Sequence, residues 1–206
     1  GLPRSTLSYA RLLHSLIGLW RQEPALRRAT LTQALLFASF SAFWTVLAFY
    51  LADPAYGLGA EVAGLFGVIG VAGVVAAPLA GRMADRLGAR PVVLVGTLLA
   101  VLAWILFETW LSLVGLALGV ILLDLGVQSA LVAHQQLIYG LRAEARGRIN
   151  TLFMTGMFLG GTLGSSLAML AWQQGGWVGV GWVGLALALS ACLAALAGKR
   201  SLQPAS

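Results

Sequence analysis

The most unusual chemical group in this sequence is an aspartate inside a long apolar run. Asp124 lies within the run 111–134. A carboxylate at the centre of a bilayer costs about 3 kcal/mol on insertion scales, so it should face a partner, water or the interior of a helix bundle. With a rise of about 1.5 Å per residue from Leu111, Asp124 is expected ~20 Å along the run, past its middle. Gln128 and Gln135 follow on approximately the same helical face.

Two interpretations of this polar stripe are open. Asp124, with Gln128 and Gln135, could form a site that binds a proton or a substrate, or that takes part in gating. The aspartate could instead be structural, hydrogen-bonded to a neighbouring helix or paired with an arginine. His134 lies at the edge of the same run and is expected to be solvated or structural.

The apolar runs that would position these groups alternate with basic residues. All 13 Lys and Arg residues fall in four segments, which precede the first run and follow the second, fourth and sixth. The connections after the first, third and fifth runs contain none. Because basic residues mark the cytoplasmic side of a membrane protein, the pattern predicts six spans with both termini in the cytoplasm. The basic segments are residues 4–28, 82–90, 142–148 and 199–200.

The composition also indicates a membrane protein. The chain of 206 residues is 59% hydrophobic and 10% charged, whereas about a quarter of the residues in a soluble domain are charged. Its net charge of +6 is divided among segments beside the apolar runs, where basic residues meet anionic lipid headgroups. Membrane lipids are therefore expected partners and nucleic acid is not. The single Cys192 lies in the last run and can form no internal disulfide.

We expect an all-α membrane protein, a bundle of six transmembrane helices preceded by an amphipathic cytoplasmic helix. Residues 1–28 are the cytoplasmic segment, 29–198 the transmembrane domain and 199–206 a cytoplasmic tail. The amphipathic helix at Tyr9–Gln22 suits a place along the membrane interface or packing on the protein. Its apolar face carries Leu12, Leu13, Leu16, Ile17 and Trp20. The expected spans are 30–52, 61–81, 91–107, 111–134, 150–172 and 177–197, and Gly175-Gly176 should form the hairpin between the last two.

The glycines recur at helical spacings in two of the runs. Small residues at every third or fourth position let helix backbones approach closely in lipid, so we expect helix packing there. A smooth surface on which helices slide is the alternative. The positions are Gly64, Gly67, Gly70 and Gly73 in the second run and Gly156, Gly160 and Gly164 in the fifth.

Residues 81–90 carry the most specific motif, Gly-Arg-Met-Ala-Asp-Arg-Leu-Gly-Ala-Arg. It resembles the Gly-x-x-x-Asp-Arg-x-Gly-Arg-Arg signature of the major facilitator superfamily, which lies in a cytoplasmic loop between the second and third helices of each six-helix half. Ala89 replaces the first arginine of the final pair and weakens the electrostatic part of the motif. In that family the acid and its basic neighbours latch the two halves together in one conformation and release them in the other. The matching residues are Gly81, Asp85, Arg86, Gly88 and Arg90.

The resemblance implies a fold and a function. Residues 23–44 are similar to the passage into the seventh helix of bacterial drug- and sugar-efflux members, and residues 145–150 to the entry into the eleventh. The chain thus resembles the C-terminal half of a twelve-helix transporter, whose partner is an N-terminal half missing from this chain. The complete protein would be a proton-driven exporter, an antiporter of the bacterial inner membrane working by alternating access. Its expected partners are a small-molecule substrate and a proton, with no cofactor and no metal.

Two other classes are less consistent with the sequence. A membrane-embedded serine protease would need a Ser–His pair, and Ser165 and His134 supply the residue types without a Gly-x-Ser-x-Gly pattern. Zinc motifs and phosphate loops are also missing from the sequence, so an enzyme is not expected. A six-helix protein that transports as a homodimer is the other alternative. Because the chain begins at Gly1 rather than Met, we expect a fragment of a longer protein.

Overall fold

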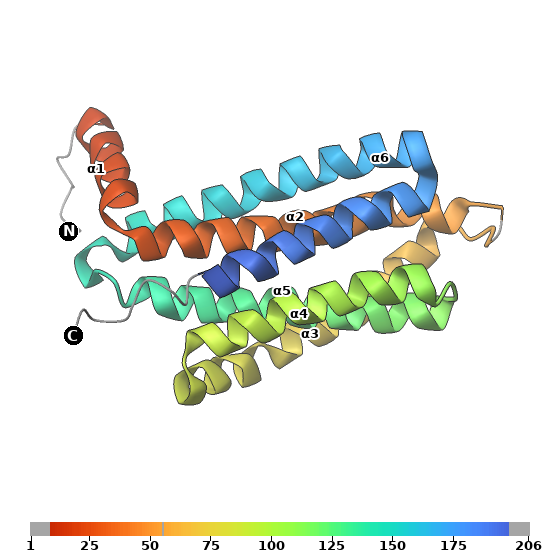
Figure 1. The fold of residues 1–206 in the computed structure, drawn as a ribbon, viewed down its shortest axis with the longest axis horizontal. Helices are drawn as coiled ribbons and strands as arrows, with labels where there is room; N and C mark the ends of the chain where they lie inside the picture. The colour runs from red at the N-terminus through yellow and green to blue at the C-terminus, as the bar shows by residue number, and fades with distance from the viewer. Residues whose placement is uncertain (1–8, 55, 198–206) are drawn as a thin grey trace, which may run out of the picture.

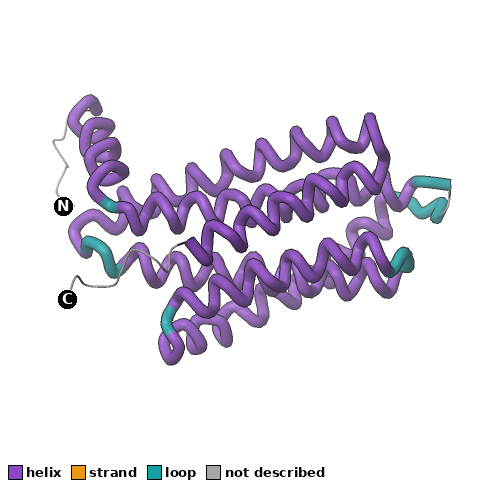
Figure 2. The backbone as a smooth tube through the Cα atoms, in the orientation of Figure 1, coloured by secondary structure: helices purple, strands orange, loops and turns teal. Residues whose placement is uncertain are grey.

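The computed structural model describes residues 9–54 and 56–197, in which every regular element is helical (Figure 2). The expected all-α fold is therefore confirmed. The elements are α1 (Tyr9–Gln22), α2 (Pro24–Ala52), α3 (Ala60–Leu87), α4 (Ala89–Thr109), α5 (Leu113–Tyr139), the short 3-10 helix η1 (Ala143–Ala145) and α6 (Arg146–Ala197).

The last helix, α6, consists of two antiparallel arms. Its backbone leaves helical geometry at Gly175 (φ −143°, ψ 15°) and Gly176 (φ 56°, ψ −145°). A positive φ costs glycine little, because it has no Cβ, and Figure 1 shows the chain reversing at this end of α6. The predicted hairpin lies at these two residues. We call residues 146–174 the first arm and residues 177–197 the second arm.

Helix length and composition fit a polytopic membrane protein. In the described part of the chain, four helical segments are long and apolar enough to cross a membrane, namely α2, α4, α5 and Ala143–Ala197, which holds both arms of α6. Helix α3 has 28 residues, of which Glu61–Val71 is a shorter apolar stretch. With the two arms separated and α3 included, the bundle contains the six long helices that the sequence predicts.

The connections between helices alternate between the two ends of the bundle. The α3–α4 and α5–α6 connections lie at the same end as the start of α2 and the last turns of α6 (Figure 1). The connections after α2 and α4, and the reversal within α6, lie at the opposite end (Figure 1). The arginines of residues 82–90 and 142–148 are thereby gathered at one end, which we call the basic end.

The first arm of α6 packs along α2 through small residues. A Cβ at Gly160 would meet the backbone of Ala34, and a Cβ at Gly164 would meet the backbone of Ala38. At Gly156 an added Cβ would meet a side chain of α2. The glycines therefore let these two helices approach until their backbones touch.

Helices α4 and α5 cross at a glycine pair that the spacing analysis did not single out. A Cβ at Gly96 would lie 2.5 Å from the carbonyl oxygen of Gly126, and a Cβ at Gly126 would meet the carbonyl oxygen of Gly96. In α3, by contrast, a Cβ at Gly64 or Gly67 would meet nothing within 4 Å. Those two positions therefore make no close helix contact within the described residues. The side-chain surroundings of Gly73 lie outside the described part of the structure.

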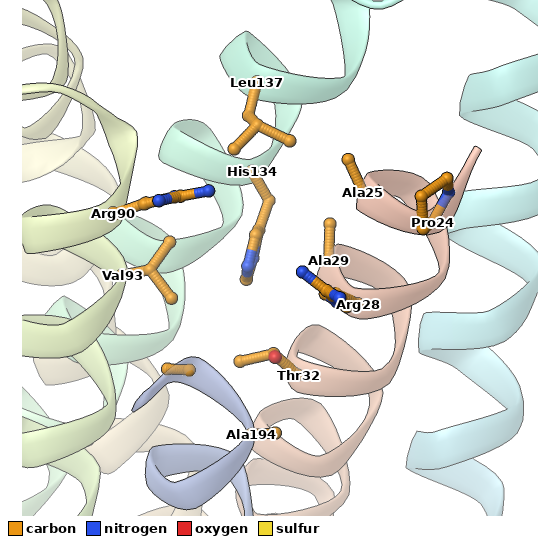
Figure 3. Close-up of a pocket in the computed structure, with 11 residues that line it drawn as sticks. Pro24, Ala25, Arg28, Ala29, Thr32, Arg90, Val93, His134, Leu137 and Ala194 are labelled. Carbon is orange, nitrogen blue, oxygen red and sulfur yellow. The ribbon is translucent and has the colours of Figure 1, made fainter. Parts of the chain in front are cut away.

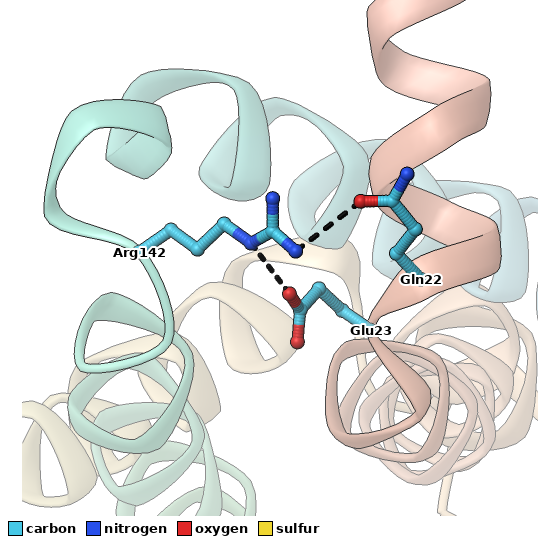
Figure 4. A network of polar contacts seen from close by, with 3 residues as sticks. All are labelled: Gln22, Glu23 and Arg142. Atoms are coloured by element: carbon cyan, nitrogen blue, oxygen red, sulfur yellow. Dashed lines mark hydrogen bonds and ion pairs between the residues drawn. The ribbon is translucent and has the colours of Figure 1, made fainter.

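An ion pair at the basic end joins the α1–α2 junction to the connection before α6. Arg142 Nε donates to Glu23 Oε1 at 2.6 Å, and Arg142 Nη2 donates to Gln22 Oε1 at 3.2 Å (Figure 4). Glu23 immediately precedes α2, so the interaction holds the start of α2 against residues far away in the sequence.

Helix α1 occupies the predicted range but uses a different residue to pack on the bundle. Leu19, which the pattern did not place on the apolar face, is buried against Leu26 and Ile149. Ile17 and Trp20 are 52% and 36% exposed. The helix therefore packs on the protein while it keeps part of its apolar face on the outside.

Most of the helices are longer than the predicted spans. Helix α5 continues to Tyr139 and α3 continues to Leu87, whereas the apolar runs end at 134 and 81. Helix α2 begins at Pro24, a first-turn position where the missing N–H of proline costs nothing. Hydropathy marks only the part of a helix that suits hydrocarbon, and the backbone hydrogen bonds continue beyond that part.

We predict that Gly160→Ala lowers the thermal stability of the protein in detergent more than Gly64→Ala does. The added methyl group at Gly160 meets the backbone of Ala34, whereas at Gly64 it enters open space. Overpacking of this kind costs roughly 1–3 kcal/mol. Size-exclusion chromatography of heated samples gives the midpoints, and equal midpoints for the two variants would contradict this account of the α2–α6 contact.

Candidate functional site

Asp124 lies near the middle of α5 and is buried. Its side chain is 6% exposed. At about 1.5 Å per residue it stands ~17 Å from the first residue of α5 and ~22 Å from the last. It therefore lies slightly before the middle of the helix rather than slightly past it, because the helix extends to Tyr139.

A glycine of α3 makes room for this carboxylate. A Cβ at Gly70 would lie 3.2 Å from Asp124 Oδ1 and 3.3 Å from Oδ2, tighter than ordinary van der Waals contact. A Cβ at Gly64 or Gly67 would meet nothing within 4 Å, so of these three α3 glycines only Gly70 lies against a side chain of α5. Helices α3 and α5 come close together beside Asp124 because Gly70 has no side chain.

The carboxylate of Asp124 is not fully satisfied. Its Oδ2 atom is buried and has no hydrogen-bond partner among the described residues. The ion pair found in that part of the chain is Arg142–Glu23 at the basic end. The structural interpretation of Asp124 required an arginine or a hydrogen bond from a neighbouring helix, and the structure gives Oδ2 neither. Burying a carboxylate oxygen without a hydrogen-bond partner costs free energy.

The other two residues of the predicted stripe lie on α5 between Asp124 and the basic end. Gln128 and Gln135 are both half-buried. They follow Asp124 at roughly 6 Å and 17 Å along the helix axis. Tyr139, at the end of the helix, donates a hydrogen bond from its hydroxyl group to Asn150 Oδ1 at 2.8 Å.

Sequence reasoning missed a buried polar pair between α2 and α5. His134 Nδ1 lies 2.9 Å from Gln33 Oε1, and Gln33 Nε2 donates to the carbonyl oxygen of Val127 at 3.5 Å. Gln33 is fully buried and His134 is 4% exposed. His134 is therefore structural, and the alternative of a solvated position is wrong, because α5 continues beyond the apolar run. The sequence feature that could have indicated this pair is Gln33, the one glutamine in the first apolar run.

The motif at residues 81–90 is mostly helical. Helix α3 continues to Leu87 and α4 begins at Ala89, so the connection is Gly88 alone, with a φ of 88°. Gly81 lies within α3, and its carbonyl oxygen accepts a hydrogen bond from Gln136 Nε2 at 3.3 Å. The expected loop is thus reduced to one residue that needs the conformational freedom of glycine.

The charged residues of the motif project from the basic end. Asp85, Arg86 and Arg90 are exposed. Among the residues that the structure describes, Asp85 takes part in no ion pair.

These features define the class of protein, a polytopic helical membrane protein with an acid in its core and with the arginines of its described connections at one end. The family model of the Major Facilitator Superfamily matches residues 29–205. The chain belongs to this superfamily of membrane transporters.

Two relatives agree with this assignment. The chain is 38% identical over 196 residues to YgaY of Escherichia coli K12, named as an uncharacterized transporter, and the match covers 92% of this chain and 49% of YgaY. It is 39% identical over 167 residues to SCO4007 of Streptomyces coelicolor, also named as a transporter, with 79% of this chain and 38% of that protein covered. The chain thus spans about half the length, or less, of these relatives. The family and the names of both relatives are those of membrane transporters.

We predict that Gln33→Leu destabilises the protein more than the double substitution Gln33→Leu/His134→Leu does. The single change leaves His134 Nδ1 buried without its partner, which costs about 1–3 kcal/mol. Removing both polar groups avoids that cost. Thermal unfolding in detergent measures the difference. If the effects of Gln33→Leu and His134→Leu alone add up to the effect of the double substitution, the two residues act independently, which would contradict the prediction.

Proposed function

We propose that this chain is the C-terminal six-helix half of a twelve-helix transporter that moves a small molecule across the bacterial inner membrane by alternating access. In this proposal transport is an antiport, in which a proton drives efflux. The observation that carries it is Asp124, a buried carboxylate with an unpartnered oxygen in the core of a member of the transporter superfamily.

The surroundings of Asp124 suit reversible binding of a proton. A carboxylate without partners in an apolar interior carries a large desolvation cost, and a bound proton removes the charge that causes it. Gly70 leaves the carboxylate covered by backbone rather than by a side chain. Gln128 and Gln135 offer hydrogen-bonding groups between this position and the basic end.

The proposed partner half is supported by length and by the exposed motif. The chain spans 49% of YgaY, which leaves room for a second set of helices. Asp85, Arg86 and Arg90 are exposed at the basic end, where an acid can interact with the positive N-terminal end of a neighbouring helix. We propose that these residues contact the N-terminal half in one conformation and release it in the other. The direction of transport rests on the resemblance to drug- and sugar-efflux members alone.

We predict that Asp124→Asn abolishes substrate-dependent proton movement, whereas Asp124→Glu retains part of it. Asparagine keeps the size of the side chain but cannot bind and release a proton, and glutamate can. The assay uses inverted membrane vesicles that contain the full-length transporter. A pH-sensitive dye reports proton movement after addition of each member of a panel of lipophilic cations and sugars.

The matched control is Glu61→Gln, which removes a carboxylate from the exposed first turn of α3. It should leave proton movement unchanged, while Asp124→Asn should lower it by at least about tenfold, the scale of losing a proton-transfer group. Wild-type rates in Asp124→Asn would remove Asp124 from the mechanism. Substrate transport without any proton movement in the wild-type protein would refute proton coupling while leaving the transporter class intact.

The orientation of the bundle gives a second test. We predict that the basic end faces the cytoplasm, because arginine-bearing connections stay on that side. In a Cys192→Ser background, Glu144→Cys at the basic end and Glu61→Cys at the other end supply single exposed thiols. An impermeant maleimide should label Glu61→Cys in intact spheroplasts and Glu144→Cys only after permeabilisation. The reverse labelling pattern would invert the proposed topology.

A further inference from the structure

A cavity of about 190 Å³ opens at the basic end of the bundle, between α2, α4, α5 and the second arm of α6. It is separate from Asp124, which does not line it. Among the residues that the structure describes, no aspartate or glutamate lines it. Their polar members are Arg28 and Thr32 from α2, Arg90 from α4 and His134 from α5.

The basic side chains converge on this cavity from different helices. Arg90 points toward His134 from α4, and Arg28 points toward it from the opposite wall, formed by α2 (Figure 3). The imidazole ring of His134 projects between them (Figure 3). Because its Nδ1 atom is engaged by Gln33, a molecule in the cavity would meet the Nε2 edge of the ring. Two guanidinium groups facing one cavity without an acid in its lining create a positive potential there.

The backbone strengthens the same potential. Arg28 lies near the start of α2, which begins at Pro24, and Arg90 lies in the first turn of α4, which begins at Ala89. The N-terminal end of a helix carries about half a positive elementary charge and unpaired N–H groups. Two helix N-terminal ends therefore border the cavity together with the two arginines.

The rest of the lining is apolar. Ala25, Ala29, Val93, Leu137 and Ala194 form most of the remaining wall. A ligand that suits both parts is amphipathic, with an anionic group for the arginines and a hydrocarbon or other apolar portion for the alanine-rich wall. Guanidinium groups bind phosphate oxygens in a bidentate manner, which makes phosphate a better match than a simple halide.

We propose that this cavity is a binding site for a phosphate-bearing anion, held by Arg28 and Arg90 with the ring of His134 between them. Two sources share this chemistry, the headgroup of an anionic phospholipid and a soluble phosphoester. The site is independent of the proposed proton site at Asp124, and it is tested by binding rather than by transport.

The test is lipid binding by the purified full chain, measured by native mass spectrometry. Phosphatidylglycerol is titrated against phosphatidylcholine, which carries no net charge, and glycerol 3-phosphate is titrated separately. The first variant is Arg28→Gln/Arg90→Gln. Its charge-matched control is Arg21→Gln/Arg82→Gln, which removes two exposed arginines that do not line the cavity. A second variant, Ala194→Phe, fills the cavity and keeps both arginines.

The proposal expects preferential binding of phosphatidylglycerol or of glycerol 3-phosphate. That binding should weaken about tenfold or more in Arg28→Gln/Arg90→Gln, as expected for lost charge-assisted hydrogen bonds. It should weaken in Ala194→Phe as well, and stay unchanged in the control pair. Binding of phosphatidylglycerol that glycerol 3-phosphate does not displace assigns the site to a lipid, and saturable binding of glycerol 3-phosphate alone assigns it to a soluble phosphoester.

Three results would overturn the proposal. The control pair could weaken binding as much as the cavity pair, which would make the effect one of general charge. Ala194→Phe could bind as well as the wild-type protein, which would place the anion outside the cavity. Phosphatidylglycerol could bind no better than phosphatidylcholine while glycerol 3-phosphate does not bind at all. Thermal midpoints of all variants are compared first, so that loss of binding is read only from folded protein.

Discussion

The contact between α2 and the first arm of α6 is a backbone contact, and the rest of the bundle is arranged around it. Gly160 and Gly164 bring α6 against the main chain at Ala34 and Ala38. In lipid, apolar side chains gain little by leaving hydrocarbon, so close packing and internal hydrogen bonds must stabilise helix association. Side chains on the remaining faces of α2 are then free to meet α4 and α5.

Those faces carry the polar groups that tie α2 to the other helices. Trp104 Nε1 donates to Ser39 Oγ at 2.6 Å, and Ser39 Oγ donates to the carbonyl oxygen of Gly184 at 3.0 Å, which links α4, α2 and the second arm of α6. Gln33 joins α2 to α5 in the same way through His134. Buried donors and acceptors are normally paired. Asp124 Oδ2 is one of four buried side-chain atoms without a hydrogen-bond partner among the described residues, and the other three are Thr30 Oγ1, Trp44 Nε1 and Glu108 Oε1.

The sequence predicted the helices, the alternation of their connections and the family, because these depend on local patterns of hydropathy, charge and one motif. It could not predict which helix faces meet. Gly64 and Gly67 have the same spacing as Gly70, yet only Gly70 among these three lies against another side chain. Gly96 and Gly126 pair across α4 and α5, although Gly96 is alone in its run and Gly126 lies seven residues beyond Gly119. Arg28, Arg90 and His134 share a cavity, but they are separated by so many residues that no spacing rule connects them.

Helix α3 connects the motif to the buried acid. Gly70 lies against the carboxylate of Asp124. About three turns farther along α3, the carbonyl oxygen of Gly81 accepts a hydrogen bond from Gln136, so both contacts are made with α5. Gly88 then turns the chain directly into α4. A shift of α3 along α5 would therefore change the cover over the carboxylate and the Gly81–Gln136 hydrogen bond together. The exposed Asp85 and Arg86 lie on this same helix, on the other side of Pro78 from Gly70. Helix α3 is therefore the element that joins the motif to the contact with Asp124.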